Sequence, residues 1–182
     1  MGRGASPWGR AIAGYEGSSF YSINRKQSLR FPALYYHETT MHTSTGILQY
    51  DPGKGQKHYN PWWALLQCDD ELSRYYARLL KSYGVEVYPN DKGLWGTHIS
   101  VLKGDVPPNQ ANWAKYDGFE VEFHYNHLIR YDNGKHAWVD VYSEDLSYIR
   151  QELGFDAKPW YHMTVGRLVR PWEVDFTKYG IT

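Results

Sequence analysis

Two short segments of the chain combine a histidine with a hydroxyl residue at the same spacing. They read His98-Ile99-Ser100 and His162-Met163-Thr164. Side chains alternate between the two faces of a β-strand, so each histidine would share a face with its hydroxyl residue, while the apolar residue between them points into the core. The sequence therefore predicts two strands that each present an imidazole beside a hydroxyl group.

Two imidazoles that face one another suit phosphoryl transfer. A neutral imidazole can accept a proton from the attacking hydroxyl or water, and a protonated one can give a proton to the leaving oxygen. Hydroxyl groups beside them can donate to the non-bridging phosphate oxygens, where negative charge grows. This chemistry needs no metal and no cofactor. The expected catalytic residues are His98, Ser100, His162 and Thr164.

The two motifs in their contexts, Gly96–Leu102 and Trp160–Val165, resemble those of the 2H phosphoesterase (LigT-like) superfamily. The resemblance covers residues 46–168. It implies an α+β fold of two pseudo-symmetric lobes, in which antiparallel sheets line a central groove and the helices lie outside. Residues 1–45 would form an N-terminal extension, and residues 46–182 would form the 2H phosphoesterase domain.

Within that superfamily, the chain is similar to the bacteriophage anti-CBASS enzymes in its size, its motif spacing and its neutral, aromatic-rich composition. This similarity implies a metal-independent phosphodiesterase, a hydrolase that opens 3′,5′ phosphodiester bonds in cyclic di- and trinucleotide immune signals and so serves viral immune evasion.

Two alternatives remain open. An RNA 2′,3′-cyclic phosphodiesterase or a 2′,5′ RNA ligase-like enzyme would use the same motifs on a different substrate. A non-catalytic module that binds or sequesters nucleotides is a hypothesis of another class. It is disfavoured because a binder needs no matched proton donor and acceptor.

The elements that must position the motifs can be traced along the chain. Residues 46–50 favour a short strand. Asn60-Pro61 resembles a helix start, and apolar residues then recur at helical spacing up to Tyr83, before Gly84. Strands are expected at 85–88 and 97–102.

The second half of the chain has a similar pattern. Residues 119–131 and 136–142 alternate as two strands of a hairpin. Ser143 is expected to cap a helix that runs to Leu153, and residues 160–168 to form the last strand. Each half thus has a helix that ends at a glycine and is followed by a strand carrying a histidine motif.

Four further residues are candidate substrate contacts: Tyr50, Lys54, Trp95 and Trp160. The three aromatic residues lie near the ends of expected strands, where they can stack on a base. Lys103 and Arg167 follow the motifs closely, but strict alternation assigns both to the core-facing side unless the strands bend.

The amino-acid composition limits the kinds of partner that the chain is expected to bind. The chain has 20 Lys and Arg against 20 Asp and Glu, so it lacks the strong positive field that long nucleic acids or anionic membranes select for. A small nucleotide is the expected partner.

The single cysteine, Cys68, favours a reducing compartment such as the cytoplasm, or the host cytoplasm if the protein is viral. His124 and His127 would point to opposite faces of a strand, so no metal site is expected. The oligomeric state is left open.

Overall fold

The computed structural model describes residues 41–57, 59–131 and 135–169, all within one compact unit. Most of the expected extension lies outside these residues. The first strand begins at His42, before the boundary expected at residue 46, and its residues 42–45 already pair with a neighbouring strand. Those four residues therefore belong to the folded unit.

The first half of the chain supplies four strands and a helix. They are β1 (His42–Tyr50), β2 (Trp63–Cys68), α1 (Asp70–Ser82), β3 (Val87–Pro89) and β4 (His98–Lys103), with a 3-10 turn at Asn90–Lys92. After a second 3-10 turn at Gln110–Asn112, the second half supplies three strands and a helix. They are β5 (Glu120–Tyr131), β6 (His136–Tyr142), α2 (Glu144–Glu152) and β7 (Tyr161–Leu168).

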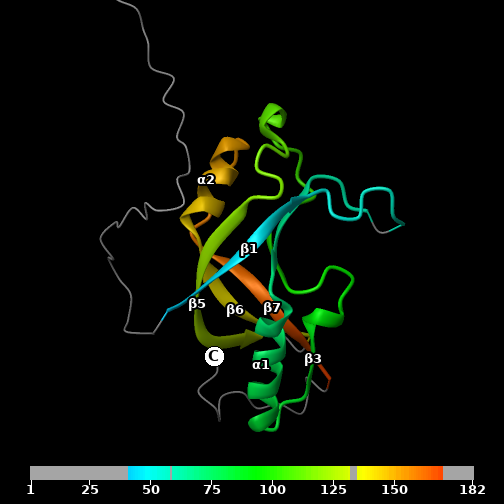
Figure 1. The fold of residues 1–182 in the computed structure, drawn as a ribbon, viewed down its shortest axis with the longest axis vertical. Coiled ribbons are helices and arrows are strands. Elements are labelled where there is room, and N and C mark those ends of the chain that lie inside the picture. Colours follow the sequence, from blue (N-terminus) through cyan, green and yellow to red (C-terminus); the bar gives the residue numbers. More distant parts are fainter. Residues whose placement is uncertain (1–40, 58, 132–134, 170–182) are drawn as a thin grey trace, which may run out of the picture. The chain divides into compact units, whose positions relative to one another are not determined.

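The strands form a single antiparallel sheet that closes on itself. The strand order is β3-β7-β4-β2-β1-β5-β6, and β6 also pairs with β7, so six strands make a barrel and β3 adds to one part of β7 (Figure 1). The expected α+β class with antiparallel strands is confirmed. The two separate sheets expected from the sequence do not form. Strands of the two halves pair directly, so neither half has an open edge where the halves meet.

The two halves of the barrel have the same order of elements. In each, a pair of antiparallel strands is followed by a helix and a third barrel strand, giving β1-β2-β4 in one half and β5-β6-β7 in the other. The first half also has β3, outside the barrel, between α1 and β4. Strands in the same position of the two halves pair with each other, β1 with β5 and β4 with β7. The two strands that carry the histidine motifs are therefore neighbours.

Strand β2 was not expected from the sequence. The segment Trp63–Cys68 lay inside the helix that was expected to begin at Asn60-Pro61, but it is an almost wholly buried strand between β1 and β4. Helix α1 begins only at Asp70, where the side chain of Asp69 accepts a hydrogen bond from the backbone N–H of Glu71. That carboxylate satisfies one of the free N–H groups at the helix start.

The helix of the second half begins where it was expected. The Ser143 side chain accepts a hydrogen bond from the backbone N–H of Leu146 and itself donates to the carbonyl of Glu122 on β5. The same hydroxyl thus caps α2 and ties it to the barrel. Neither helix of the described residues is long and apolar enough to cross a membrane.

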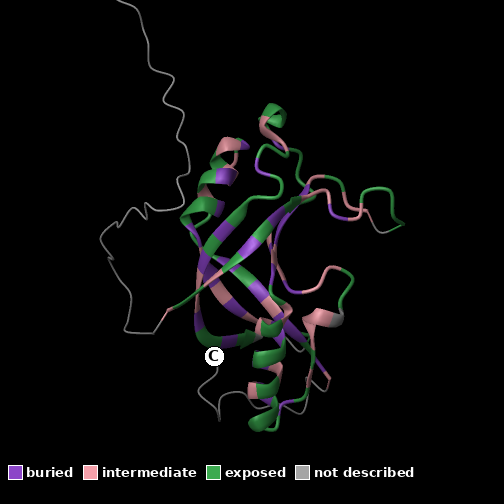
Figure 2. Cartoon of the chain, in the orientation of Figure 1, coloured by how far each residue is buried: buried purple, intermediate pink, exposed green. Residues whose placement is uncertain are grey.

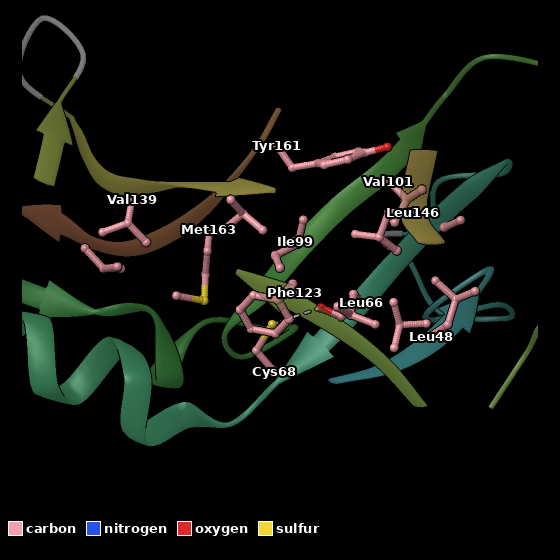
Figure 3. Close-up of a cluster of buried hydrophobic side chains, with 14 of the residues drawn as sticks. Leu48, Leu66, Cys68, Ile99, Val101, Phe123, Val139, Leu146, Tyr161 and Met163 are labelled. Atoms are coloured by element: carbon pink, nitrogen blue, oxygen red, sulfur yellow. Dashed lines mark hydrogen bonds between the residues drawn. The ribbon is translucent and has the colours of Figure 1, made fainter. Parts of the chain in front are cut away.

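The hydrophobic core fills the inside of the barrel. Figure 2 shows buried and exposed residues alternating along the strands, as expected for strands with one face turned inward. Ile99 of β4 and Met163 of β7, both 0% exposed, lie in the core with Phe123 of β5 (Figure 3). Fully burying one such side chain contributes about 1.5–3 kcal/mol. Core packing thus fixes the central residue of each histidine motif.

Candidate functional site

The two histidine motifs meet at the contact between β4 and β7. Ile99 pairs with Met163 in this antiparallel contact. Because residue numbers run in opposite directions along antiparallel strands, the same register sets His98 across from Thr164 and Ser100 across from His162. The motifs, far apart in sequence, therefore form one cluster.

All four polar residues of the motifs share a face. Ile99 and Met163 point into the core, so the residues on either side of them point outward. His162 is exposed, and the other three are partly exposed. In place of the expected groove between two sheets, the cluster lies on the outer face of one continuous sheet, because β4 and β7 pair directly.

The two imidazoles are diagonal neighbours across the strand pair. Such positions are separated by roughly 7–8 Å, with the side-chain bases somewhat closer, which is within reach of long side chains. The charge on His98 acts on His162 and lowers its pKa. The two rings are thus close enough to approach one small group from two sides.

His98 is held in a defined orientation. Its Nδ1 lies 3.0 Å from the carbonyl oxygen of Gly96, which can only accept a hydrogen bond, so Nδ1 carries the hydrogen and Nε2 of the neutral ring is an acceptor. Burial lowers the pKa of His98, and the nearby charge of Lys103 lowers it further, against the opposing effect of the Gly96 hydrogen bond. The neutral ring is therefore favoured.

His162 has different neighbours. Burial again lowers its pKa, with a further contribution from Lys158, whereas Asp140 acts in the opposite direction. Asp140 is the cross-strand partner of His162 on β6 and forms an ion pair with Arg130 at 2.6 Å. The ring of Trp138 lies edge-on at 6.3 Å. Within the described part of the chain, only His162 of the two histidines therefore has a nearby carboxylate that favours its protonated form.

The Ser100 hydroxyl is held by a tryptophan. Nε1–H of Trp63 donates a hydrogen bond to Ser100 Oγ at 3.2 Å. Since the oxygen is occupied as an acceptor, its own hydrogen is available to donate outward. Thr164, across from Trp138, occupies the corresponding place on β7.

A bulge follows the motif on β4. Ala64 pairs with Leu102 and Leu65 pairs with Ser100, so Val101 is an extra residue in the strand. An extra residue reverses the alternation beyond it. Lys103 is therefore on the histidine face and exposed, with Nζ 4.2 Å from the centre of the Trp63 ring.

Strand β7 has a bulge at the same place in its motif. Ala137 pairs with Gly166 and Trp138 with Thr164, which leaves Val165 as the extra residue. Arg167 is consequently exposed on the histidine face. Strict alternation had assigned Lys103 and Arg167 to the core side, and the two bulges overturn that expectation. The two motifs thus have the same order of residues: a histidine, an apolar residue, a hydroxyl residue and a bulged valine. A cationic residue follows two positions after the valine.

Two of the four expected substrate contacts, Trp160 and Trp95, border this face. Trp160 is 40% exposed, and its ring lies 6.0 Å from that of Tyr142. Trp95 lies edge-on to Trp63 at 5.5 Å. The turn carrying Lys54 packs on Trp95, since a Cβ at Gly53 would fall 2.0 Å from its ring.

Tyr50, another expected substrate contact, does not lie on this face. Its side chain is on the inward-facing side of β1 with Leu48, which is 0% exposed, and it packs against the core. Its ring lies edge-on to Trp113 at 4.8 Å, and burial raises the pKa of its hydroxyl. An even spacing from Leu48 along the strand places it on the core face.

Trp63 and Asp140 are site residues that the sequence did not single out. Trp63 lay inside the segment expected to be helical, and Asp140 was one of several alternating polar residues of an expected strand. Its alignment with His162 follows only from the register between β6 and β7.

Other features of the described residues do not compete with this cluster. No group of three His, Cys, Asp or Glu residues within them is arranged to hold a metal ion. A hollow of about 380 Å³ between α1 and β3 includes Arg74, Arg78 and Asp91 in its lining but no residue of either motif.

Comparison of the chain with protein-family models, with curated proteins and with solved structures finds no match. The chemistry of the cluster must therefore be inferred from its residues and their geometry.

Proposed function

We propose that the protein is a metal-independent phosphodiesterase that cleaves a phosphodiester bond of a small nucleotide at the His98–His162 pair. The pairing of Ile99 with Met163 carries the proposal, because it brings both imidazoles and both hydroxyls to one outward face. Two proton-transfer groups and two hydrogen-bond donors around one position are what phosphoryl transfer requires.

His98 acts as the general base. Its Nδ1 is occupied by the Gly96 carbonyl, so Nε2 presents the lone pair, and its lowered pKa keeps the ring neutral. Nε2 takes a proton from water as the water oxygen forms a bond to phosphorus.

His162 acts as the general acid. The bond between phosphorus and the leaving sugar oxygen breaks, its electron pair stays on that oxygen, and the oxygen takes a proton from His162. The carboxylate of Asp140 favours the protonated ring that this step requires. The products are a terminal phosphate and a free hydroxyl, and proton transfer through solvent restores both histidines.

The two hydroxyl residues of the face stabilise the phosphate. The hydroxyls of Ser100 and Thr164 donate to its non-bridging oxygens. Lys103 and Arg167 add positive charge next to the two motifs in a chain with no formal net charge. That local charge favours a small anionic substrate without attracting long nucleic acids.

The repeated order of elements supports the further proposal that the chain has the pseudo-symmetric 2H phosphoesterase fold. As substrate we propose a cyclic di- or trinucleotide immune signal, which places the protein among viral anti-CBASS enzymes acting in the host cytoplasm. Trp160, which packs on Tyr142, and Trp95, which packs on Trp63, precede the two motifs and suit a substrate with bases on both sides of the phosphate.

The test is hydrolysis of a substrate panel in excess EDTA, followed by chromatography. The panel holds cyclic di- and trinucleotides, a dinucleoside monophosphate and a nucleoside 2′,3′-cyclic phosphate. We expect the cyclic oligonucleotides to be opened to linear products. We also expect His162→Ala to slow the reaction about 100-fold or more, the usual size of a general acid effect.

Three results would count against the proposal. Cleavage of no member of the panel would remove the enzyme hypothesis and leave a nucleotide-binding module. Loss of activity in EDTA would contradict the metal-independent mechanism. Cleavage of the 2′,3′-cyclic phosphate alone would indicate an enzyme that acts on RNA ends, and it would overturn the proposed substrate.

A further inference from the structure

Lys103 has an unusual position for a strand residue next to the motif. The bulge at Val101 turns it onto the histidine face, where it lies across from Trp63 in the pairing of β2 with β4. Its Nζ is 4.2 Å from the centre of the Trp63 ring. A cation over the face of a tryptophan is attracted by the ring's negative face, so the ammonium group is held in place rather than swinging through solvent.

The ring that supports Lys103 is itself part of the site. Trp63 is 2% exposed, donates its N–H to Ser100 Oγ at 3.2 Å, and lies edge-on to the His98 ring at 5.5 Å. Trp95 packs against it from another side. The position of the ammonium group is therefore fixed relative to the two motif residues of β4.

No carboxylate among the described residues neutralises Lys103. Arg74, Arg78, Lys115 and Arg130, by contrast, each form an ion pair with a carboxylate. The charge of Lys103 instead reaches His98, whose pKa it lowers. An oriented cation that has no acidic partner within the described part of the chain, at the edge of a phosphate site, is suited to a second anionic group of the same ligand.

Lys103 is too far along the strand to share the phosphate between the histidines. That phosphate lies around the Ile99–Met163 pair, whereas Lys103 follows Ser100 beyond an extra residue and pairs with the first residue of β2. Its natural ligand is the next phosphate of an oligonucleotide.

We propose that Lys103, seated on Trp63, binds a second phosphate of the substrate and so selects nucleotides with two or more phosphates over single phosphodiesters. This inference rests on the proposed function and deepens it, because it names the feature that the substrate must carry. Cyclic oligonucleotides have that feature, whereas a dinucleoside monophosphate does not.

The experiment compares two substrates and two variants of the full-length protein. The substrates are a cyclic dinucleotide, with two phosphates, and the dinucleoside monophosphate with the same bases. Lys103→Met keeps an alkyl chain on Trp63 and removes the charge, whereas Lys103→Arg keeps the charge. Lys81→Met on α1, in the lining of the hollow beside β3, is the control.

We expect Lys103→Met to raise KM for the cyclic dinucleotide roughly tenfold, as a lost charged contact does, and to leave KM for the monophosphate within about twofold. Lys103→Arg should stay within a few-fold of the wild type for both substrates. The acidic limb of the pH profile should also move to higher pH in Lys103→Met, because His98 loses a neighbour that lowers its pKa. A merely structural role would not move that limb.

The outcomes separate the two proposals. Equal KM changes for both substrates, or no change for either, would overturn the role of Lys103 while the proposed function stands. If the wild type cleaves neither substrate, the proposed function fails and the Lys103 inference falls with it.

Discussion

Two copies of one short motif give two different histidines. His98 has its Nδ1 fixed by a backbone carbonyl, while His162 is exposed and faces Asp140 across the strand pair. The motif therefore sets where each imidazole lies, and the neighbouring strands set which protonation state each one favours. A base and an acid need that difference.

The rate of phosphodiester cleavage should depend on pH. Both histidine pKa values lie below the usual 6.5, so the neutral rings dominate at pH 7 and above. In the proposed mechanism His98 must be neutral, but His162 must be protonated, and its protonated fraction falls as pH rises through its lowered pKa. We expect kcat/KM for the cyclic dinucleotide to peak on the acid side of pH 6.5 and to decline toward pH 8.

A pair of variants tests the assignment of the acid. Asp140→Asn removes the neighbour that raises the His162 pKa, so the alkaline limb should move to lower pH. Arg130→Met breaks the same ion pair but leaves the Asp140 carboxylate free to act on His162, so the limb should move to higher pH. Shifts in the same direction in both variants would refute the role given to Asp140.

At the residue scale, alternation alone was enough to predict that the four motif residues share a face. It failed at Lys103 and Arg167 because each follows a bulged valine, and nothing in the sequence marks Val101 or Val165 as extra residues. The same alternation places Tyr50, two residues after the buried Leu48, on the core side of its strand.

At the scale of elements, the contact between β4 and β7 holds the site together. It is short, with Ile99 and Met163 as its one register pair, whereas β6 and β7 share six. Both residues are fully buried, so side-chain packing reinforces a contact with little backbone pairing.

A cross-link can test this register. Directly opposite residues of antiparallel strands have Cα atoms about 4.5 or 5.5 Å apart, within the range that a disulfide spans. In a Cys68→Ala background, we expect Ile99→Cys with Met163→Cys to form a disulfide on mild oxidation, detected by mass spectrometry of peptides. The diagonal pair Val101→Cys with Met163→Cys should form it poorly. The opposite preference would show that the motifs are out of register.

Most elements could be predicted from the sequence, but β2 could not. The strands of the second half alternate clearly, and Ser143 is a strong helix cap. Trp63–Leu66 in β2, by contrast, is a continuous apolar run, buried because β1 and β4 flank it, and such a run does not distinguish a strand from a buried helix. The Asn60-Pro61 pair before it resembles a helix start, so the sequence wrongly predicts that the helix begins before this strand.

At the scale of the whole molecule, the two halves depend on each other. Each contributes three strands to the barrel, and the pairs β1·β5 and β4·β7 close it. The sequence suggested the repeat, but not that the halves merge into one sheet, since pairing between distant strands leaves no local signal. One consequence is that neither half by itself holds a complete site.

In the proposed mechanism, the histidines of the two halves act together on one phosphorus. The most direct measurement is the single-turnover rate of cyclic dinucleotide cleavage in EDTA for His98→Ala, His162→Ala and the double variant, with folding checked by circular dichroism. Groups that act as a unit are strongly non-additive. We predict that each single variant loses about 100-fold or more, and that the double variant loses at most about tenfold beyond that. Losses that multiply in the double variant, or a single variant that keeps its rate, would contradict the account.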